Sequence, residues 1–355
     1  MSSHALKAGR LLNRALIATA LAAQVFAGSA HADETDRFRG AVEAVQAKKP
    51  YKIAFSAVHF SDKFWMAMTY GMQDEAKLGG ADLVSALSAG GYGNLQQQIS
   101  DLETLAAQRP DGIIVAGATY DGLARTIKRI AESGIKVVVA GTPVNSKDVA
   151  LGVLEDESLV GQQMGEYLCS KAPKSQVIAL PGPQGSEWNK IRFDGYMKAV
   201  KACGIESVGN TFQGQMSLED GQKQASDLLI KYPDAKYVWA VAGLLGDGAA
   251  ASIKRLGRSD VKVVTSAFTE LTKPMMEDGF IDASVSEPSI LTGRLAVQYM
   301  IRLLNGDDVS GAKPGQLPYP VVVVPTKPIE AKDIASYDLN KYDWAPDGWK
   351  NPFSQ

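Results

Sequence analysis

Lys52-Ile53-Ala54-Phe55 opens a repeating pattern of short apolar runs and amphipathic stretches. An amphipathic stretch follows over residues 64–77, and the next apolar run is Asp82-Leu83-Val84. Later apolar runs of the same kind occupy residues 112–115, 136–139, 176–179, 237–240 and 261–264. Short apolar runs that alternate with amphipathic segments are typical of parallel sheets covered by helices. The predicted fold class is therefore α/β.

The number of predicted strands indicates two lobes. Ten or more strands are too many for one ordinary sheet, so we expect two doubly wound parallel-sheet lobes joined by a multi-strand hinge. The expected parts are an N-terminal lobe of residues 33–150 with 283–318, a C-terminal lobe of residues 151–282 with 319–330, and an aromatic C-terminal tail of residues 331–355. Ligands of such sheets bind beyond the carboxyl ends of the strands. Two facing lobes would therefore place their loops around one cleft.

Residues 1–32 have the pattern of a cleavable secretory signal peptide. Lys7, Arg10 and Arg14 precede an apolar run over residues 15–27, and Ala30-His31-Ala32 provides an A-x-A cleavage site. The run is too short for a membrane anchor, which needs about 20 apolar residues. We expect an exported, periplasmic chain that is not embedded in a membrane.

Composition excludes several classes of function. Loss of the leader changes the formal net charge from −2 to −5, which gives no electrostatic footprint for nucleic acid. His59 is the one histidine outside the leader, and with two cysteines it nearly excludes a closed Cys/His zinc site, which needs four such ligands; neither metal nor cofactor is expected. Cys169 and Cys203 follow consecutive predicted helices, and they form either a disulfide or two buried thiols.

Aromatic residues follow five of the predicted strands. The candidates for ligand contact are Phe64, Trp65, Tyr92, Tyr120, Trp188 and Phe268. Several rings around one cleft suit a methylated or otherwise apolar cation. For each ring the alternative is ordinary core packing, and Trp188, which follows a Pro/Gly loop, is the strongest candidate for ligand contact. Glu287 either balances a cationic ligand or forms a cap or a bond between the lobes.

Other polar residues and motifs are less informative. One of Lys190 and Arg192 is expected to face the cleft, and His59 either donates to a ligand or caps the loop. The sequence contains no phosphate-binding loop, nucleophile elbow or metalloprotease helix, and residues 243–248 have the reverse of the dinucleotide-binding spacing. We therefore expect a binding protein rather than an enzyme.

Four segments resemble one family of periplasmic sensors. Residues 62–73, 89–95, 180–183 and 246–251 are similar to the TorT family, which senses trimethylamine N-oxide (TMAO) within the type I periplasmic binding protein superfamily. The resemblance implies a bilobal protein that closes on TMAO and signals to the periplasmic domain of a membrane histidine kinase. It also implies that Trp65, Tyr92 and Trp188 belong to an aromatic cage. Phe64 stands where the family tends to have tyrosine, and Phe268 departs from the family's tyrosine.

The wider superfamily supplies the alternative, a substrate-binding subunit of an ABC importer for a sugar or other small metabolite. Sugar binders place carboxylates or amides in the cleft loops, because each buried hydroxyl needs a partner. The corresponding stretches here are Thr119-Tyr120 and Ala242-Gly243, and Lys190 stands where sugar binders commonly have arginine. These residues favour the sensor over the sugar importer.

Overall fold

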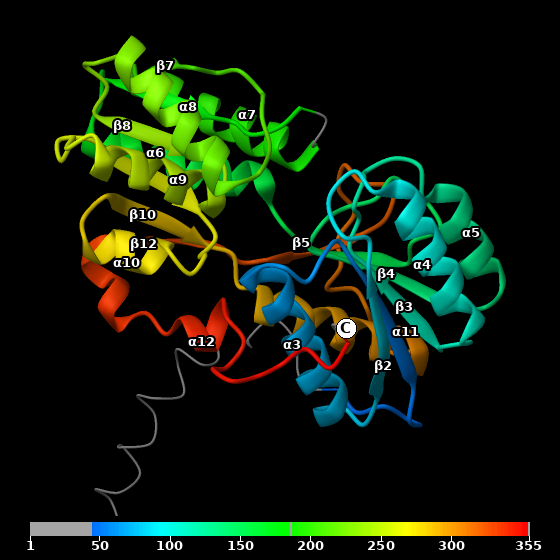
Figure 1. Ribbon diagram of the computed structural model, residues 1–355. Helices are drawn as coiled ribbons and strands as arrows, with labels where there is room; N and C mark the ends of the chain where they lie inside the picture. The colour runs from blue at the N-terminus through cyan, green and yellow to red at the C-terminus, as the bar shows by residue number, and fades with distance from the viewer. Residues whose placement is uncertain (1–44, 185–186, 354–355) are drawn as a thin grey trace, which may run out of the picture. The chain divides into compact units, whose positions relative to one another are not determined.

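The computed structural model describes residues 45–184 and 187–353, and these residues form two six-stranded sheets (Figure 1). They belong to one compact unit of the chain. The expected signal peptide of residues 1–32 lies outside the described residues. The two sheets, each covered by helices, confirm the predicted α/β class with two parallel-sheet lobes.

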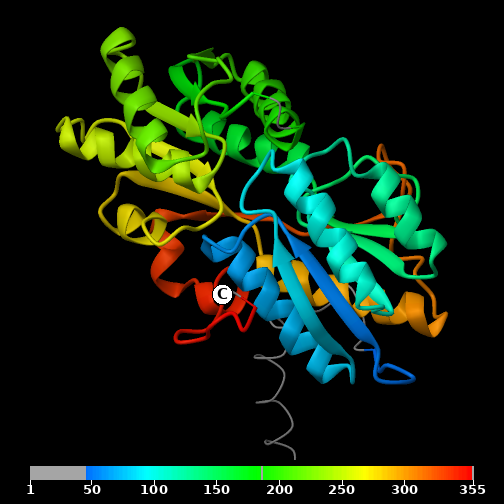
Figure 2. The same ribbon diagram turned by 45° about the vertical axis from the view of Figure 1, so that its right-hand side comes forward.

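The first sheet is parallel throughout and has the strand order β11-β5-β4-β3-β1-β2. Its strands are β1 (Lys52–Ala57), β2 (Asp82–Ser88), β3 (Gly112–Val115), β4 (Lys136–Ala140), β5 (Leu151–Glu155) and β11 (Val321–Val324). Its helices are α3 (Lys63–Leu78), α4 (Leu95–Ala107), α5 (Ala124–Glu132) and α11 (Ser289–Asn305). Helices α3 and α11 pack together, and Figure 2 shows α4 and α5 on the other side of the strands.

The second sheet has the order β12-β10-β9-β8-β6-β7, with β12 antiparallel to β10. Its strands are β6 (Gln176–Leu180), β7 (Glu206–Val208), β8 (Tyr237–Ala240), β9 (Lys262–Ser266), β10 (Ile281–Ser286) and β12 (Lys327–Glu330). Its helices are α6 (Glu157–Lys171), α7 (Glu187–Ala202), α8 (Leu218–Lys231), α9 (Gly243–Arg255) and α10 (Thr272–Glu277). A short 3-10 helix η1 (Ala331–Ser336) and helix α12 (Leu339–Tyr342) follow β12.

The chain passes between the two sheets three times, and these crossings differ from the expected lobe boundaries. Strand β5 belongs to the first sheet, although residues 151–282 were assigned to the C-terminal lobe. Strand β11 also belongs to the first sheet, whereas β10 stays in the second sheet through Ser286. The physical reason is that a short apolar strand can pair at the edge of either sheet, and its own residues do not specify the partner.

Helices α6 and α7 cross closely, and this crossing places Arg192. A Cβ atom on Gly161 of α6 would overlap the carbonyl oxygen of Arg192, and one on Gly195 of α7 would overlap that of Ser158. Larger side chains at the two glycines would force the helices apart. The short separation brings the Arg192 side chain to the start of α6, where it meets Glu157.

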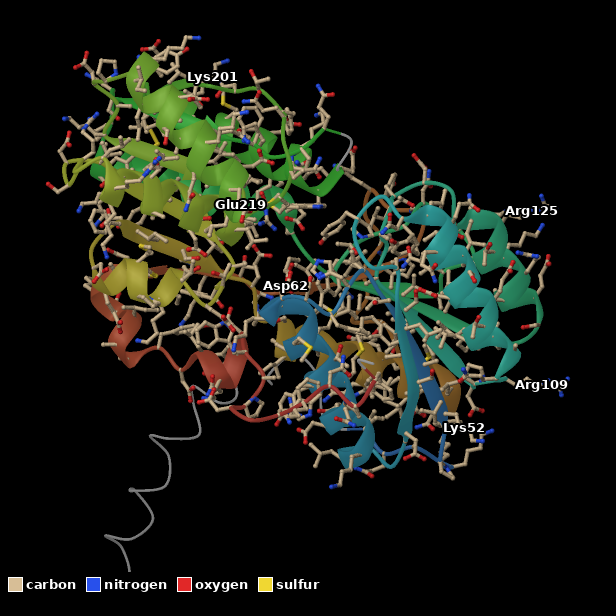
Figure 3. All side chains as sticks on the ribbon, viewed as in Figure 1. Lys52, Asp62, Arg109, Arg125, Lys201 and Glu219 are labelled. Carbon is tan, nitrogen blue, oxygen red and sulfur yellow. A yellow bond between two sulfur atoms is a disulfide. The ribbon has the colours of Figure 1, made fainter. Side chains whose placement is uncertain are left out.

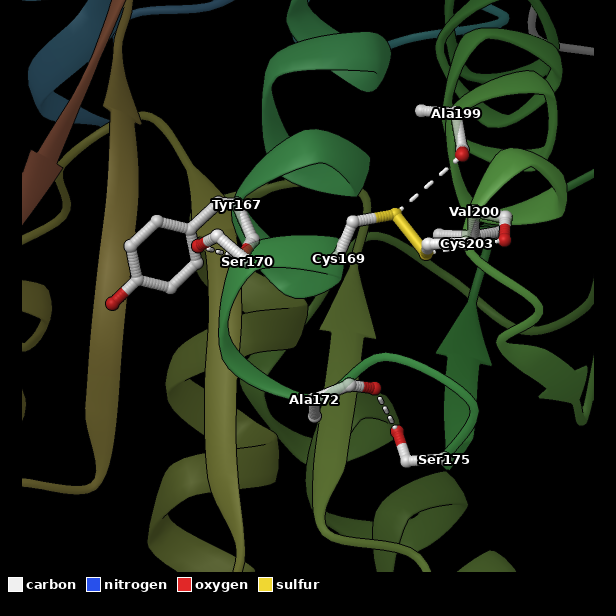
Figure 4. The surroundings of a disulfide bond; sticks show 8 residues. All are labelled: Tyr167, Cys169, Ser170, Ala172, Ser175, Ala199, Val200 and Cys203. Carbon is white, nitrogen blue, oxygen red and sulfur yellow. Dashed lines mark hydrogen bonds between the residues drawn. A yellow bond between two sulfur atoms is a disulfide. The ribbon is translucent and has the colours of Figure 1, made fainter.

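A disulfide joins the ends of the same two helices (Figure 4). Cys169 lies in the last turn of α6, and Cys203 follows α7 directly. Their Cα atoms are 5.7 Å apart, and the Sγ atom of Cys169 also lies 3.5 Å from the carbonyl oxygen of Ala199. Of the two alternatives left open by the sequence, the structure has the disulfide.

Candidate functional site

A cavity of about 670 Å³ is lined by loops from both sheets. The lining segments include residues 59–66 after β1, 242–244 after β8 and 267–271 after β9. Glu155 and Glu287, at two of the crossings between the sheets, also line it. Loops beyond the carboxyl ends of parallel strands are the usual position of a ligand site in this fold class. Figure 3 shows Asp62 at this end of the first sheet, whereas Lys52 and Arg109 lie at its opposite end.

Trp65 forms a deeply buried part of the cavity wall. The Asp62 carboxylate caps helix α3 by accepting a hydrogen bond of 3.0 Å from the backbone N–H of Trp65, which fixes the start of the helix. The Trp65 side chain is 1% exposed and meets the Phe64 ring edge to face, with 5.0 Å between the centroids. Both rings line the cavity.

Tyr92 and His59 continue the same wall. Their rings lie edge to face at 5.9 Å, and a side-chain hydrogen bond joins Tyr92 to Trp65. Burial lowers the pKa of His59, whereas the nearby Asp62 carboxylate has the opposite, smaller effect. The imidazole is therefore held neutral, with its Nδ1 atom 2.9 Å from the Ser61 hydroxyl.

Trp188 comes to the cavity from α7, but one face of its indole is already occupied. The Arg192 guanidinium lies over the ring at 5.0 Å from the centroid, in cation–π geometry. The Trp188 Nε1 atom is buried and has no hydrogen-bond partner among the described residues. Of the expected pair, Arg192 lines the cavity, whereas Lys190 is exposed and pairs with Asp194 at 2.5 Å.

Arg192 is the centre of a buried ionic network. Its side chain is 2% exposed and donates to the Glu157 carboxylate and, at 2.7 Å, to Glu287. It also donates to the Ser266 hydroxyl and to the Val241 carbonyl oxygen, at the ends of β9 and β8. Burial alone would lower the pKa of Arg192, but the two carboxylates raise it above its usual value. The guanidinium therefore stays charged and joins α6, α7 and three strand ends.

The carboxylates around Arg192 outnumber its charge. Burial raises the pKa of Glu157 to about 7, while the attraction of Arg192 acts in the opposite direction. Glu155, the last residue of β5, is 8% exposed and lines the same cavity. Burial, with the like charges of Glu287 and Glu157, raises the pKa of Glu155 well above its usual value. Its carboxyl oxygens have no hydrogen-bond partner among the described residues of the chain.

A second polar group on the wall is Asp247 of α9. It accepts hydrogen bonds from the hydroxyls of Thr269 and Thr272, the latter at 3.0 Å, and burial raises its pKa to about 6. Sequence reasoning compared residues 243–248 with a dinucleotide motif and passed over this carboxylate. The signal available was its position after a predicted strand end.

Most of the residues proposed from the sequence line this one cavity. They are Phe64, Trp65, Tyr92, Trp188, Phe268 and Glu287. Phe268 is 5% exposed and stacks on Tyr337, so most of its surface packs inside the protein. Tyr120 lines a neighbouring cavity of about 750 Å³ instead, which Tyr92 and Trp188 also line. The structure thus brings the three expected cage rings to one cavity and leaves Tyr120 outside it.

The cavity lining has an excess of acidic groups. Acidic lining residues are Asp62, Glu155, Glu157, Asp247, Glu270, Glu287 and Asp347, and basic ones are Lys63 and Arg192. Arg192 is already shared by two carboxylates, so the acidic side chains of the lining outnumber the basic ones that could balance them. Low-dielectric walls of one sign concentrate ligands of the opposite charge.

The C-terminal tail also contributes to the cavity, which sequence reasoning missed because the tail has no periodic pattern. Residues 345–349 line the cavity. Trp344 donates from its indole Nε1 to the Phe268 carbonyl oxygen at 2.9 Å. Trp349 donates to Gln73 of α3 at 3.3 Å, and its ring meets Tyr70 edge to face. The aromatic residues of the tail therefore attach it to elements of both sheets.

Two features are absent from the described residues, a cluster of metal ligands and a membrane-spanning helix. No group of three or more His, Cys, Asp or Glu side chains in residues 45–184 and 187–353 could hold a metal ion. Within the same ranges, no helix has the length and apolar character needed to cross a bilayer.

Comparison with known proteins identifies the family. Residues 53–308 match the model of the periplasmic binding protein domain. The chain belongs to this family. It is a periplasmic solute-binding protein, and members of the family bind ligands without acting on them as enzymes.

This periplasmic binding protein is similar to several proteins of known structure or known name. The substrate-binding protein of a sugar ABC transport system from Bordetella parapertussis 12822 is 38% identical, with a TM-score of 0.85 over 89% of this chain and 100% of its own. An ABC transporter solute-binding protein from Bradyrhizobium sp. BTAi1, solved with bound bis-tris, is 28% identical with a TM-score of 0.77 over 88% and 92%. Periplasmic protein TorT of Escherichia coli K12 is 24% identical over 75% of this chain and 76% of its own.

Proposed function

We propose that this periplasmic binding protein takes a small organic cation into the cavity beside Trp65, Tyr92 and Trp188. The observation that carries the proposal is the combination of these rings with an excess of carboxylates on one wall. Aromatic faces attract alkylated cations by about 0.5–2 kcal/mol each, and the attraction is larger where water is excluded. Acidic groups on the cavity wall also attract a positively charged ligand.

The polar groups of the cavity favour a cation over a sugar. No asparagine or glutamine side chain is among the described residues that line it. A buried sugar needs a partner for each hydroxyl, and amides supply both donors and acceptors. Arg192, a donor that a sugar hydroxyl could use, is already engaged by Glu157 and Glu287, and Asp247 is engaged by two threonines.

A relative offers independent support for an amine. The Bradyrhizobium protein, 28% identical, was solved with bound bis-tris. Bis-tris is a tertiary amine that becomes a cation on protonation. Bis-tris therefore belongs to the class of amines that we propose for this chain.

The proposed role in the cell is delivery of the cation to an ABC importer. The Bordetella protein, which is 38% identical, is named as the substrate-binding protein of such a system. We place the protein in the periplasm, to which the leader pattern of residues 1–32 directs it. Co-purification of the loaded protein with a permease would support this role.

A second candidate role is sensing. The matching TorT protein and the ring positions Trp65, Tyr92 and Trp188 favour a receptor that binds TMAO and contacts the periplasmic domain of a histidine kinase. If that kinase domain binds the TMAO-loaded protein but not the empty protein, the sensor role is supported in place of the importer role.

The ligand class is tested by calorimetric titration with choline, betaine, TMAO and ribose. We expect a cation to bind with a Kd near 1 μM, which corresponds to about −8 kcal/mol. Trp188→Ala should weaken that binding at least about tenfold, or 1.4 kcal/mol, because the indole lines the cavity. Tyr120→Ala is the matched control, because Tyr120 lines the neighbouring cavity and not the proposed ligand cavity. This variant should leave the Kd unchanged. Heat from ribose and none from the other three compounds would overturn the proposal.

Shortening the tail should speed ligand release. Deletion of residues 345–355 removes the part of the tail that lines the cavity and keeps Asp343 and Trp344 in place. We expect the dissociation rate of the bound cation to rise about tenfold, because changes at a binding surface act mostly on dissociation. Stopped-flow displacement measures this rate. Trp349→Phe, which keeps a ring beside Tyr70, should give a smaller change, and an unchanged rate in the deletion would exclude the tail from the site.

A further inference from the structure

We propose that Glu155 holds the charged group of the ligand, and that the ligand is therefore a protonated amine with at least one N–H rather than a quaternary ammonium or an amine oxide. This inference rests on the proposed function and names the substrate class more narrowly. It concerns one carboxyl group whose surroundings differ from those of its neighbours.

Glu155 lacks the partners that the other two central carboxylates have. Glu157 and Glu287 both form hydrogen-bonded ion pairs with Arg192. Glu155 is equally buried, lines the same cavity, and has no hydrogen-bond donor to its carboxyl oxygens among the described residues. A buried carboxyl oxygen without a partner is costly, so a ligand that supplies the missing donor gains the value of that bond.

The charges around Glu155 show what kind of donor fits. The groups that face it are Glu157, Glu287, Arg192 and Asp343. Arg192 is the positive group in this set, and two carboxylates already share it. The Asp343 carboxyl group is already engaged, because it accepts from Ser286 at 3.0 Å and from Tyr337 at 2.7 Å.

Two further acidic residues, Asp62 and Asp247, line the same cavity. The Asp62 carboxylate lies 3.6 Å from the His59 ring, and Asp247 accepts hydrogen bonds from the hydroxyls of two threonines. The missing partner of Glu155 must therefore carry both positive charge and a hydrogen. An ammonium N–H supplies both, and such charge-assisted bonds are about twice as strong as neutral ones. A quaternary ammonium supplies the charge alone.

The geometry implies opposite pH dependence for two kinds of ligand. In the empty protein, burial and the like charges of Glu287 and Glu157 raise the pKa of Glu155, so the group tends to keep its proton. An ammonium needs the ionised carboxylate, and its binding releases this proton to solvent; its affinity should therefore rise with pH. An amine oxide would instead accept a hydrogen bond from protonated Glu155, and its affinity should fall as pH rises.

The test compares N,N-dimethylethanolamine with choline and TMAO by calorimetry at pH 6 and pH 8. The first two compounds differ by replacement of one N–H with a methyl group, and both are cations at these pH values. We expect dimethylethanolamine to bind at least about tenfold more tightly than choline, to bind more tightly at pH 8 than at pH 6, and to release a proton. Glu155→Gln should abolish the preference and weaken the pH dependence, because Glu157, whose pKa is about 7, still titrates in this range.

Asp82→Asn is the control, because Asp82 is an exposed acidic residue at the start of β2 and is not among the residues that line the cavity. It should change neither quantity more than about threefold, since exposed charges are screened. Thermal unfolding of each variant checks that it is folded. If choline binds as tightly as dimethylethanolamine or more tightly, this inference is overturned while the cation-binding function stands. The inference is also overturned if TMAO binds most tightly of the three compounds and binds more tightly at pH 6 than at pH 8. Failure of every cation to bind would overturn the function itself.

Discussion

Replacement of Arg192 with methionine is expected to lower the free energy of unfolding by about 3–5 kcal/mol. The guanidinium is 2% exposed, and its loss leaves Glu157 and Glu287 buried without a counter-charge. The bonds to Ser266 and Val241 are lost as well. Urea denaturation followed by circular dichroism measures the change.

The matched control for this prediction removes all three charges together. The triple variant Arg192→Met, Glu157→Gln, Glu287→Gln no longer contains the two unpaired carboxylates that the single variant creates. It should recover a large part of the lost stability, because neutral replacement of a whole buried ionic cluster is often close to neutral. A single variant within about 1 kcal/mol of the native protein would show that the network is not a structural element.

Trp65→Ala is expected to lower the free energy of unfolding by a similar amount, about 3–5 kcal/mol, because it removes a large side chain that is 1% exposed. The change also removes the ring against Phe64 and the hydrogen bond to Tyr92. Cation binding should be lost in the same variant, since a large part of the cavity wall disappears. Denaturation and calorimetric titration give the two measurements.

Two further variants separate packing from ligand contact at this position. Trp65→Phe keeps a ring but loses the bond to Tyr92, so its stability should fall less than that of the alanine variant. Phe64→Ala removes a half-buried neighbour from the same cavity and should cost less stability than Trp65→Ala. If Trp65→Ala cost less than about 1 kcal/mol, the indole would not be the core residue that its burial indicates.

The sequence predicted the α/β class because the strand and helix signals are local. Buried parallel strands such as β1 and β3 are short apolar runs, and their pattern needs no knowledge of the partner strand. The assignment of β5 and β11 to the first sheet was not predictable in this way. Their placement depends on edge pairing with strands far away in the chain, which a single sequence does not record.

The candidate site was predictable to the extent that it follows strand ends. Trp65, Tyr92 and Trp188 line the cavity because parallel strands direct their loops to one edge. Glu155 was missed because it lies at a crossing whose position depends on the misplaced strand β5. The sequence indicated that either Lys190 or Arg192 faces the cavity, but it could not decide between them. Which side of helix α7 faces the cavity depends on how this helix packs against α6.

The position of β11 in the chain also determines when the first sheet can form all of its strand pairs. Val321–Val324 pairs with β5, which lies between β11 and β4. During synthesis or translocation, the first sheet therefore stays unfinished until residue 324 of 355 has emerged. Until then β5, rather than the short strand β11, is the edge strand of this sheet. A product terminated before Val321 would lack the pairing of β11 with β5, and it would expose the buried strand β5 to pairing with other chains.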